Sequence, residues 1–238
     1  MRQKKPTVSV VIPVLNEAKR IAGLVESLSK QTYLPQEILV VDSRSEDTTA
    51  NVAKSAGATV LQSGRGVARQ RNHGGHKATG ELIFFMDADV TLKPDFIERC
   101  VAEKERRNLS LACPHYWPYG STVFIKFLHL TYNLTFWTMQ KLVPSGGGSC
   151  IIATSEVFRR SGGFNEALPF EDMQFLRQAG KYGKFGFIKP FIGVSDRRFK
   201  HDGVLRTALL YALLTPLFIL NLYGLTRFIR YNFGHYEK

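Results

Sequence analysis

Two aspartates one residue apart follow an apolar run in the segment GELIFFMDADVTLKPDF, residues 80–96. The run LIFFM is typical of a buried strand, and Asp87 and Asp89 come directly after it. In an extended segment residues i and i+2 point to the same side, so both carboxylates can face one pocket. Such oxygens bind Mg²⁺ or Mn²⁺, whose remaining ligands are phosphate oxygens and water. The alternative is a polar strand exit leading into a helix near Pro94.

A second pair of acids, Glu171 and Asp172, lies in the segment PFEDMQFLR, residues 169–177. Both stand at the start of a predicted helix, where negative side chains interact favourably with the helix dipole whatever else they do. A carboxylate in this position can also serve as a general base. Arg177, one turn further on, is interpreted either as a partner that orients these carboxylates or as a surface charge.

The elements that must position these acids alternate along the first hundred residues. Alternating strands and helices predict a parallel α/β sheet with helices on both faces. The first helix is expected to begin behind an Asn16 cap. Predicted strands cover residues 7–15, 37–43, 58–62 and 81–87, and predicted helices cover residues 16–31, 45–57 and 66–80.

Ligands of such sheets bind at the carboxyl ends of the strands, and polar residues follow several of the predicted strands. The first strand leads into Asn16 and Glu17, the second into Asp42, and the fourth into the two aspartates described above. One shared site is therefore expected at this edge. The turn PVLNEAKR lacks the glycines of a dinucleotide-binding fold, and no P-loop motif occurs, so a nicotinamide or flavin cofactor is not expected.

Four segments together resemble the family 2 glycosyltransferases, the inverting nucleotide-sugar enzymes of GT-A fold. VSVVIPVLNE, ILVVDSRSEDTT, GVARQRNHGGHKATGELIFFMDAD and FEDMQFLRQ occur in the order and spacing of that family, over roughly residues 7–200. The resemblance implies a Rossmann-like, mostly parallel sheet flanked by helices, a UDP- or GDP-sugar donor, a divalent metal (Mg²⁺ or Mn²⁺) and transfer of one sugar to a hydroxyl or phosphate acceptor. The chain departs from the family at Ser43 and Arg44, where many members have an acid and a glycine.

The resemblance also implies roles for residues at matched positions. An inverting transfer needs a base on the acceptor side, away from the metal, and the family's Glu-Asp motif favours Asp172 as the base with Glu171 as a supporting acid. The glycines Gly147 and Gly148 precede a short predicted strand and are expected beside the donor sugar and acceptor, with a flexible turn as the alternative. For the donor, the implied residues are Pro13, Asn16, Glu17 and Asp42 in the nucleoside pocket, Arg71 near the base or diphosphate, Asp87 near the ribose and Asp89 on the metal.

A basic segment, VSDRRFKHDG at residues 194–203, follows the acidic helix. Its arginines are predicted to close over the diphosphate and screen its charge, and His201 is a candidate metal ligand. An anionic-lipid patch or a solvated turn are the alternatives. The Gln-x-x-Arg-Trp motif of processive synthases in this family is absent, so a single addition per encounter is predicted.

The overall charge and the cysteines limit the partners and the compartment. The net charge of +12 favours a polyanionic partner: a diphosphate, an anionic membrane surface or a nucleic acid. Because Lys and Arg are scattered without interleaved aromatic residues, no nucleic acid is expected. The three cysteines form no Cys-x-x-Cys pair and no apolar signal segment opens the chain, which indicates a reducing, cytosolic location.

Two hydrophobic stretches suggest a membrane. Residues 207–225 approach the ~20 residues that cross a bilayer, but Pro216, Asn221 and Gly224 interrupt them. Residues 121–142 are amphipathic, and a helix lying in the headgroup region is one interpretation. Packing of both stretches on the catalytic domain is the other. The favoured location is the cytoplasmic side of the cell membrane, as a peripheral or monotopic enzyme with a lipid-linked or membrane-proximal acceptor; one membrane crossing or a soluble cytoplasmic protein are alternatives.

The predicted organisation is one GT-A catalytic domain, residues 1–203, with a hydrophobic and basic helical tail, residues 204–238. Within the domain a nucleotide-binding half ends near residue 112 and an acceptor half begins near residue 113. Two other functions remain open. A nucleotidyltransferase also uses paired acids and Mg²⁺ on an α/β sheet, and a non-catalytic protein could bind nucleotide sugars alone. The sequence does not indicate the oligomeric state.

Overall fold

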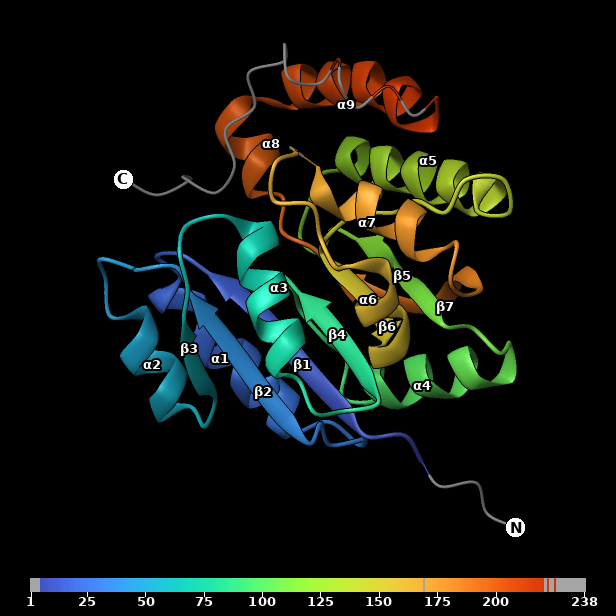
Figure 1. Cartoon of the computed structure of the whole chain (residues 1–238). Coiled ribbons are helices and arrows are strands. Elements are labelled where there is room, and N and C mark those ends of the chain that lie inside the picture. The colour runs from blue at the N-terminus through green and yellow to red at the C-terminus, as the bar shows by residue number, and fades with distance from the viewer. Residues whose placement is uncertain (1–4, 169, 221, 223–224, 226–238) are drawn as a thin grey trace.

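A seven-stranded sheet runs through the protein in the strand order β3-β2-β1-β4-β6-β5-β7 (Figure 1). The computed structural model describes residues 5–168, 170–220, 222 and 225. β6 is antiparallel to both β4 and β5, while the other pairings are parallel, so the predicted mostly parallel sheet is confirmed. The strands are β1 (Val8–Val14), β2 (Glu37–Asp42), β3 (Thr59–Gln62), β4 (Leu82–Met86), β5 (Leu111–Trp117), β6 (Cys150–Thr154) and β7 (Phe185–Gly193).

Helices cover both faces of this sheet, with α3 in front of it and α1 and α4 behind it in Figure 1. α1 shows why: its four buried side chains recur at helical spacing and pack on the sheet, namely Ile21, Leu24, Val25 and Leu28. The helices are α1 (Ala18–Ser29), α2 (Thr49–Ser55), α3 (Val67–Lys77), α4 (Phe96–Arg106), α5 (Val123–Met139), α6 (Ser155–Ser161), α7 (Glu171–Ala179), α8 (Arg197–Asp202) and α9 (Val204–Ile219).

The start of α1 differs from the prediction. Asn16 does not cap the helix; it has a left-handed φ of 55°, and Glu17 takes the cap position without a side-chain hydrogen bond. The Asn16 amide oxygen instead accepts a hydrogen bond of 2.9 Å from the backbone N–H of Glu46. This bond links the loops that follow β1 and β2, and it uses the acceptor that a cap would need.

Close packing of α3 on the sheet depends on a glycine. A Cβ at Gly74 would collide with the Val11 side chain and lie 2.9 Å from Cγ2 of Val41. Without that atom, the helix lies directly on β1 and β2. One turn earlier on the same helix, Arg71 is thereby carried to the carboxyl ends of the strands.

α5 is held to the sheet by its polar side. The buried Asn133 accepts a hydrogen bond from the Tyr116 backbone N–H at 3.0 Å and donates one to its carbonyl at 2.8 Å. Gln140 accepts one from the Phe187 backbone N–H at 2.9 Å. Asn133 and Gln140 thus bond to strand backbone, while the exposed side of α5 is apolar. The placement of this helix in the headgroup region stays a prediction.

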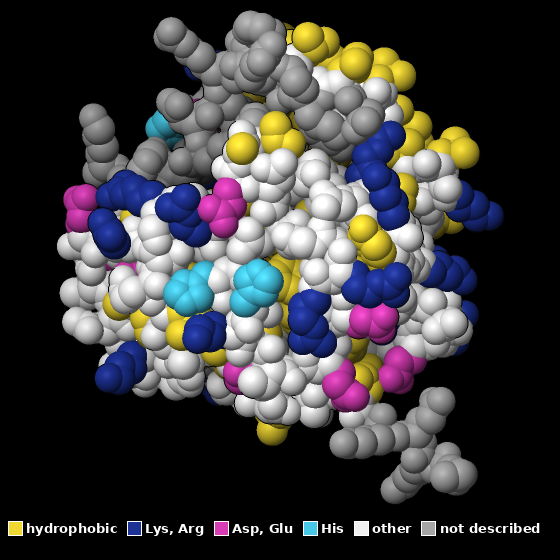
Figure 2. All heavy atoms as spheres, viewed as in Figure 1, with side chains coloured by type: hydrophobic (Ala, Val, Ile, Leu, Met, Phe, Trp, Pro, Cys, Tyr) yellow, Lys and Arg dark blue, Asp and Glu magenta, His cyan; other side chains and the backbone are white. Residues whose placement is uncertain are grey.

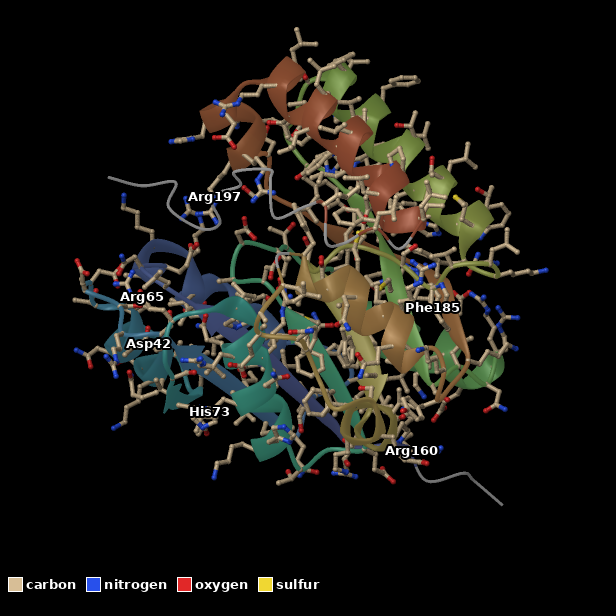
Figure 3. The ribbon with its side chains drawn as sticks, turned by 45° about the horizontal axis from the view of Figure 1, so that its top comes forward. Asp42, Arg65, His73, Arg160, Phe185 and Arg197 are labelled. Carbon is tan, nitrogen blue, oxygen red and sulfur yellow. The ribbon has the colours of Figure 1, made fainter. Side chains whose placement is uncertain are left out.

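α9 lies beside α5 in the views of Figures 1 and 3, on the side of the sheet where the carboxyl ends of β1 and β4 lie. Figure 2 shows apolar side chains gathered over this upper region of the molecule. Within the part of the chain that the structure describes, none of the helices is long and apolar enough to cross a membrane. Of the predicted tail, residues 221, 223, 224 and 226–238 lie outside the described residues.

The predicted division near residue 112 falls inside β5, which pairs with β6 and β7 in the continuous sheet. The two halves therefore share one sheet and one hydrophobic core. Their assignment as nucleotide-binding and acceptor halves stays a prediction.

Candidate active site

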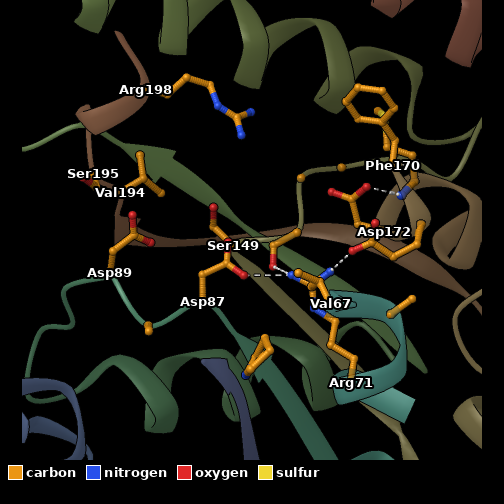
Figure 4. Close-up of a pocket in the computed structure, with 18 of the residues that line it drawn as sticks. Val67, Arg71, Asp87, Asp89, Ser149, Phe170, Asp172, Val194, Ser195 and Arg198 are labelled. Atoms are coloured by element: carbon orange, nitrogen blue, oxygen red, sulfur yellow. Dashed lines mark hydrogen bonds and ion pairs between the residues drawn. The ribbon is translucent and has the colours of Figure 1, made fainter. Parts of the chain in front are cut away.

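A cavity of about 730 Å³ opens at the carboxyl ends of β1 and β4 (Figure 4). Its walls come from the turn after β1, from α3, from the loops around β4 and β6, and from α5, α7, α8 and α9. Three predicted site residues are not among its lining: Asn16, Asp42 and His201. Those that line it are Pro13, Glu17, Arg71, Asp87, Asp89, Gly147, Gly148, Glu171 and Asp172.

The buried Arg71 joins the two acidic segments. Its Nη1 donates to Oε1 of Glu171 at 2.8 Å, and its Nη2 donates to Oδ1 of Asp87 at 2.8 Å and to the Gly148 carbonyl at 2.9 Å. Burial opposes the charge of the guanidinium, but Asp87 and Glu171 outweigh burial and raise the pKa of Arg71. One cation thus brings together carboxylates from β4 and α7.

The two aspartates nearest Arg71 have perturbed pKa values. Burial raises the pKa of Asp87 to about 6, although Arg71 lowers it in part. Burial, together with the Glu171 carboxylate, raises the pKa of Asp172 to about 7. A hydrogen bond of 2.8 Å from the Met173 backbone N–H fixes Oδ1 of Asp172. Asp172 is therefore able to take up and release a proton near neutral pH.

Asp89 lies across the cavity from Asp172, as Figure 4 shows, and contacts an arginine. Nη2 of Arg197 donates to Oδ2 of Asp89 at 2.9 Å and to Oε1 of Glu17 at 3.0 Å. Burial opposes the charge of this arginine, but Asp89 and Glu17 outweigh burial and raise its pKa. Arg197, labelled in Figure 3, thus connects the start of α8 with the loops after β1 and β4.

The carboxylates of Asp87 and Asp89 fit a divalent cation. The Asp87 and Asp89 side chains keep 34% and 24% of their surface exposed and line the cavity, where Mg²⁺ or Mn²⁺ needs one or two carboxylates beside phosphate oxygens. Across the described residues, no group of three or more His, Cys, Asp or Glu side chains forms a metal site by itself. His201 is exposed and pairs through Nδ1 with Oδ1 of Asp202 at 2.7 Å.

Asp42 sits behind the cavity wall. It is buried and accepts hydrogen bonds from the Ser45 backbone N–H at 3.2 Å and from Nε2 of Gln62 at 3.1 Å. Ser43 is the residue of this strand end that lines the cavity. Arg44 has a φ of 62°, the left-handed region that glycine favours, which is the residue type many family members have there.

The two predicted glycines, Gly147 and Gly148, lie where a side chain would contact neighbouring residues closely. A Cβ on Gly148 would lie 2.8 Å from Nη2 of Arg71 and 2.9 Å from Oδ2 of Asp172. A Cβ on Gly147 would lie 3.0 Å from the Tyr132 hydroxyl, and the Gly147 carbonyl accepts a hydrogen bond of 2.6 Å from the Tyr116 hydroxyl. The backbone at Gly148 thus runs directly against the proposed base.

Several cavity residues escaped the sequence reasoning. Aromatic residues in an amphipathic helix carry no signal that distinguishes a cavity wall from core packing, so Tyr132 of α5 was not singled out. The predictions for Arg177 are both wrong: it donates to the carbonyls of Phe218 at 2.9 Å and Ile219 at 3.3 Å, where it satisfies the last carbonyls of α9. Besides Tyr132, the cavity-lining residues that the sequence reasoning missed include Tyr116, Ser149, Phe170, Tyr211 and Phe218.

Fold and cavity together define an α/β protein whose carboxylates gather at the strand ends. Residues 9–162 match the family model described as Glycosyl transferase family 2. This match covers more than half of the chain, and the protein belongs to glycosyl transferase family 2.

Curated relatives agree with this assignment. The chain is 30% identical over 125 residues to glycosyltransferase GlyG of Streptococcus pneumoniae (48% of this chain, 40% of the relative). It is 28% identical over 178 residues to chondroitin synthase of Escherichia coli (70% of this chain, 25% of the relative). It is 34% identical over 110 residues to an undecaprenyl-phosphate 4-deoxy-4-formamido-L-arabinose transferase of Pseudomonas fluorescens (42% of this chain, 32% of the relative). The matched parts thus span well under half of each of these relatives.

Solved structures share the fold. The mannosyltransferase PcManGT from Pyrobaculum calidifontis, in complex with GDP-Man and Mn²⁺, gives a TM-score of 0.68 at 21% identity, covering 89% of this chain and 65% of that one. Staphylococcus aureus TarS 1-349 in complex with UDP gives a TM-score of 0.64 at 20% identity, covering 81% of this chain and 62% of that one. Glucosyl-3-phosphoglycerate synthase from Mycobacterium tuberculosis, in complex with Mn²⁺, UDP and glucosyl-3-phosphoglycerate, gives a TM-score of 0.62 at 20% identity, covering 88% of this chain and 79% of that one. The predicted GT-A-like fold is confirmed.

Proposed function

We propose that this protein is an inverting glycosyltransferase that moves one sugar from a UDP- or GDP-sugar to a hydroxyl or phosphate acceptor. Family membership supports the nucleotide-sugar donor. The observation that carries the mechanism is the position of Asp172 across the cavity from Asp87 and Asp89 (Figure 4). The acceptor is lipid-linked or membrane-proximal, and the enzyme works as a peripheral protein on the cytoplasmic side of the cell membrane.

Asp172 is the general base of this proposal. For a hydroxyl acceptor, its carboxylate takes the proton while the acceptor oxygen bonds to the anomeric carbon and the bond from that carbon to the diphosphate oxygen breaks. One displacement on the face opposite the leaving group inverts the configuration. A pKa of about 7 suits the task, because the group is a stronger base than an ordinary aspartate and is still ionised in a useful fraction near neutral pH.

Arg71 and Glu171 position this base. Glu171 is held by Arg71 at 2.8 Å, and the same guanidinium holds Asp87 at 2.8 Å. The acceptor side and the donor side are thus fixed relative to one another through one buried side chain. Glu171 also adds to the negative potential that keeps the pKa of Asp172 high.

A divalent cation fits on the donor side. Asp89 would hold it, with Asp87 beside it, and when bound it would neutralise the charge of the departing nucleoside diphosphate. Pro13 and Glu17 line the cavity where the nucleoside is proposed to bind. The side chains of Arg197 and Arg198 also line the cavity and can approach the diphosphate.

A donor screen that measures release of UDP or GDP in the presence of Mn²⁺ tests this function. We expect release from one class of nucleotide sugar, accompanied by transfer to an acceptor. Release of pyrophosphate from a nucleoside triphosphate would instead identify a nucleotidyltransferase. Binding of a nucleotide sugar without turnover for any donor and acceptor, unaffected by Asp172→Asn, would identify a non-catalytic binding protein.

A further inference from the structure

The outer side of α5 is a stripe of large apolar side chains. From Phe124 on they recur every three or four residues, which places them on one face of the helix. Each is exposed by between 50% and 84%, although the polar side of the same helix is buried against β5 and β7. The stripe consists of Val123, Phe124, Phe127, Leu130, Leu134 and Trp137.

α9 extends this surface. Leu205, Leu209 and Leu213 recur every four residues on its outer side and are 59–69% exposed. Its inner side, with Thr207, Leu214 and Phe218, is buried. Since α5 and α9 lie side by side in Figures 1 and 3, the two rows form one surface, here called the apolar face. It lies at the top of Figure 2.

The two helices that form the apolar face carry charged side chains of one sign only. Residues 106–155 and 203–236, which include both helices, contain no Asp or Glu. Lys126 of α5, Lys141 just after it and Arg206 of α9 are the basic side chains of these helices and their immediate flank. Two copies of the chain joined through this face about a two-fold axis would bring these cations together, which opposes a dimer. A surface rich in negative charge and apolar chains is the complement.

We propose that the apolar face is a docking surface for a lipid bilayer that contains anionic lipids. Large apolar side chains enter the boundary between headgroups and acyl chains, to a depth of about 5–10 Å, while Lys and Arg contact the phosphates. Burial of the exposed rings and leucines supplies most of the affinity, and the cations add a part that depends on salt.

The inner sides of the same helices line the catalytic cavity. Tyr132 and Phe136 of α5 and Leu214 and Phe218 of α9 belong to its wall. Among the described residues, α5 and α9 therefore have one side on the cavity and the other on the apolar face. If the proposed glycosyl transfer is correct, this placement assigns an acceptor with an apolar tail, held in the bilayer with its reactive head directed to Asp172.

Sedimentation with vesicles tests the surface on the full chain. The probes are vesicles of 70% phosphatidylcholine with 30% phosphatidylglycerol, and vesicles of phosphatidylcholine alone. We expect tighter binding to the anionic vesicles, with part of the affinity kept at high salt. Leu209→Gln should lower the partition coefficient about tenfold, because a leucine would no longer enter the apolar phase. Leu34→Gln is the matched control, since Leu34 is 63% exposed and Leu209 61%, and Leu34 lies in the loop before β2.

Tryptophan emission provides a second readout that needs no catalytic activity. Trp117 and Trp137 are the two tryptophans of the chain, and in a Trp117→Phe background the emission reports on Trp137 in the apolar face. A shift to shorter wavelength on addition of anionic vesicles is expected. Because neither readout uses turnover, loss of vesicle binding and loss of glycosyl transfer are separate results.

Three outcomes would overturn the proposal. Binding that is absent, or that Leu34→Gln and Leu209→Gln reduce equally, would show that the apolar face does not contact lipid. Binding that high salt abolishes completely, with unchanged Trp137 emission, would leave only a charge contact. A concentration-dependent dimer that Leu209→Gln dissociates, without vesicle binding, would assign the apolar face to a second copy of the chain.

Discussion

Arg197 donates a hydrogen bond of 2.9 Å to Asp89, so a guanidinium stands beside the carboxylate that the sequence predicts for a divalent cation. The same nitrogen contacts Glu17 at 3.0 Å. A cation that binds Asp89 must therefore share this carboxylate with Arg197 or displace it. The contact links the occupancy of the donor side to the position of α8.

Replacing this arginine should strengthen metal binding in the absence of a donor. Arg197→Gln removes the competing positive charge, and we expect the dissociation constant of Mn²⁺ to fall by about tenfold, which corresponds to about 1.4 kcal/mol. Calorimetry or the electron paramagnetic resonance of free Mn²⁺ measures it. Arg198→Gln is the control with the same change in charge, since Arg198 contacts Tyr211 at 3.1 Å. Equal effects of both substitutions would indicate a general charge effect.

The buried arginine of α3 should be essential for stability. Arg71→Met leaves the carboxylates of Asp87 and Glu171 without their cation, and breaking such a buried pair costs about 3–5 kcal/mol in the free energy of unfolding. Urea denaturation measures the loss. Arg69→Met on the same helix breaks the exposed pair with Glu166, 2.9 Å apart, and should cost less than about 1 kcal/mol. Similar losses for both variants would contradict the central structural role of Arg71.

The raised pKa of Asp172 predicts how stability depends on pH. The pKa is 3.8 without perturbation and about 7 in the folded protein, so the folded state disfavours the charged form. The folded state therefore loses stability as the pH rises from about 4 through 7. Asp172→Asn removes this loss, and its unfolding temperature should exceed that of the unchanged protein by more at pH 8 than at pH 5. A pH-independent difference would mean that the carboxyl titrates normally.

A side chain at Gly148 should damage the site without disturbing the sheet. In Gly148→Ala the new Cβ would meet Arg71 at 2.8 Å and Asp172 at 2.9 Å, so both side chains must shift. We expect at least a hundredfold loss in transfer, since a displacement of about 1 Å has that effect on catalysis. Gly23→Ala is the control, because a Cβ built there has no described atom within 4 Å outside its own stretch of helix, and alanine favours the α1 helix. Full activity of Gly148→Ala would show that this backbone does not confine the reacting groups.

The periodicity of the first hundred residues predicts their fold well. Runs such as VSVVIPV and LIFFM are buried on every residue, as parallel strands covered on both faces must be. The order of the later strands was not predictable in the same way, because β6 enters antiparallel between β4 and β5 through contacts distant in sequence. Short-range pattern carries no information on such pairings.

The same limit applies to the site. Sequence reasoning placed Asp87, Asp89 and Asp172 around one site, and all three line one cavity. It did not find that Arg71 joins Asp87 to Glu171, since an arginine on a helix gives no sign of its partner 100 residues away. It also did not predict which side of α5 packs on the sheet, because polar residues that bind strand backbone look the same in sequence as polar residues that face water.

The separate roles of Asp89 and Asp172 are tested most directly by measuring donor binding and sugar transfer on the same two variants. With the donor found by the screen, calorimetry gives the affinity and product formation gives the rate. We predict that Asp172→Asn binds the donor nearly as tightly as the unchanged protein and transfers no sugar, whereas Asp89→Ala loses donor affinity and turnover together. Transfer by Asp172→Asn at the unchanged rate would contradict the assignment of Asp172 as the base.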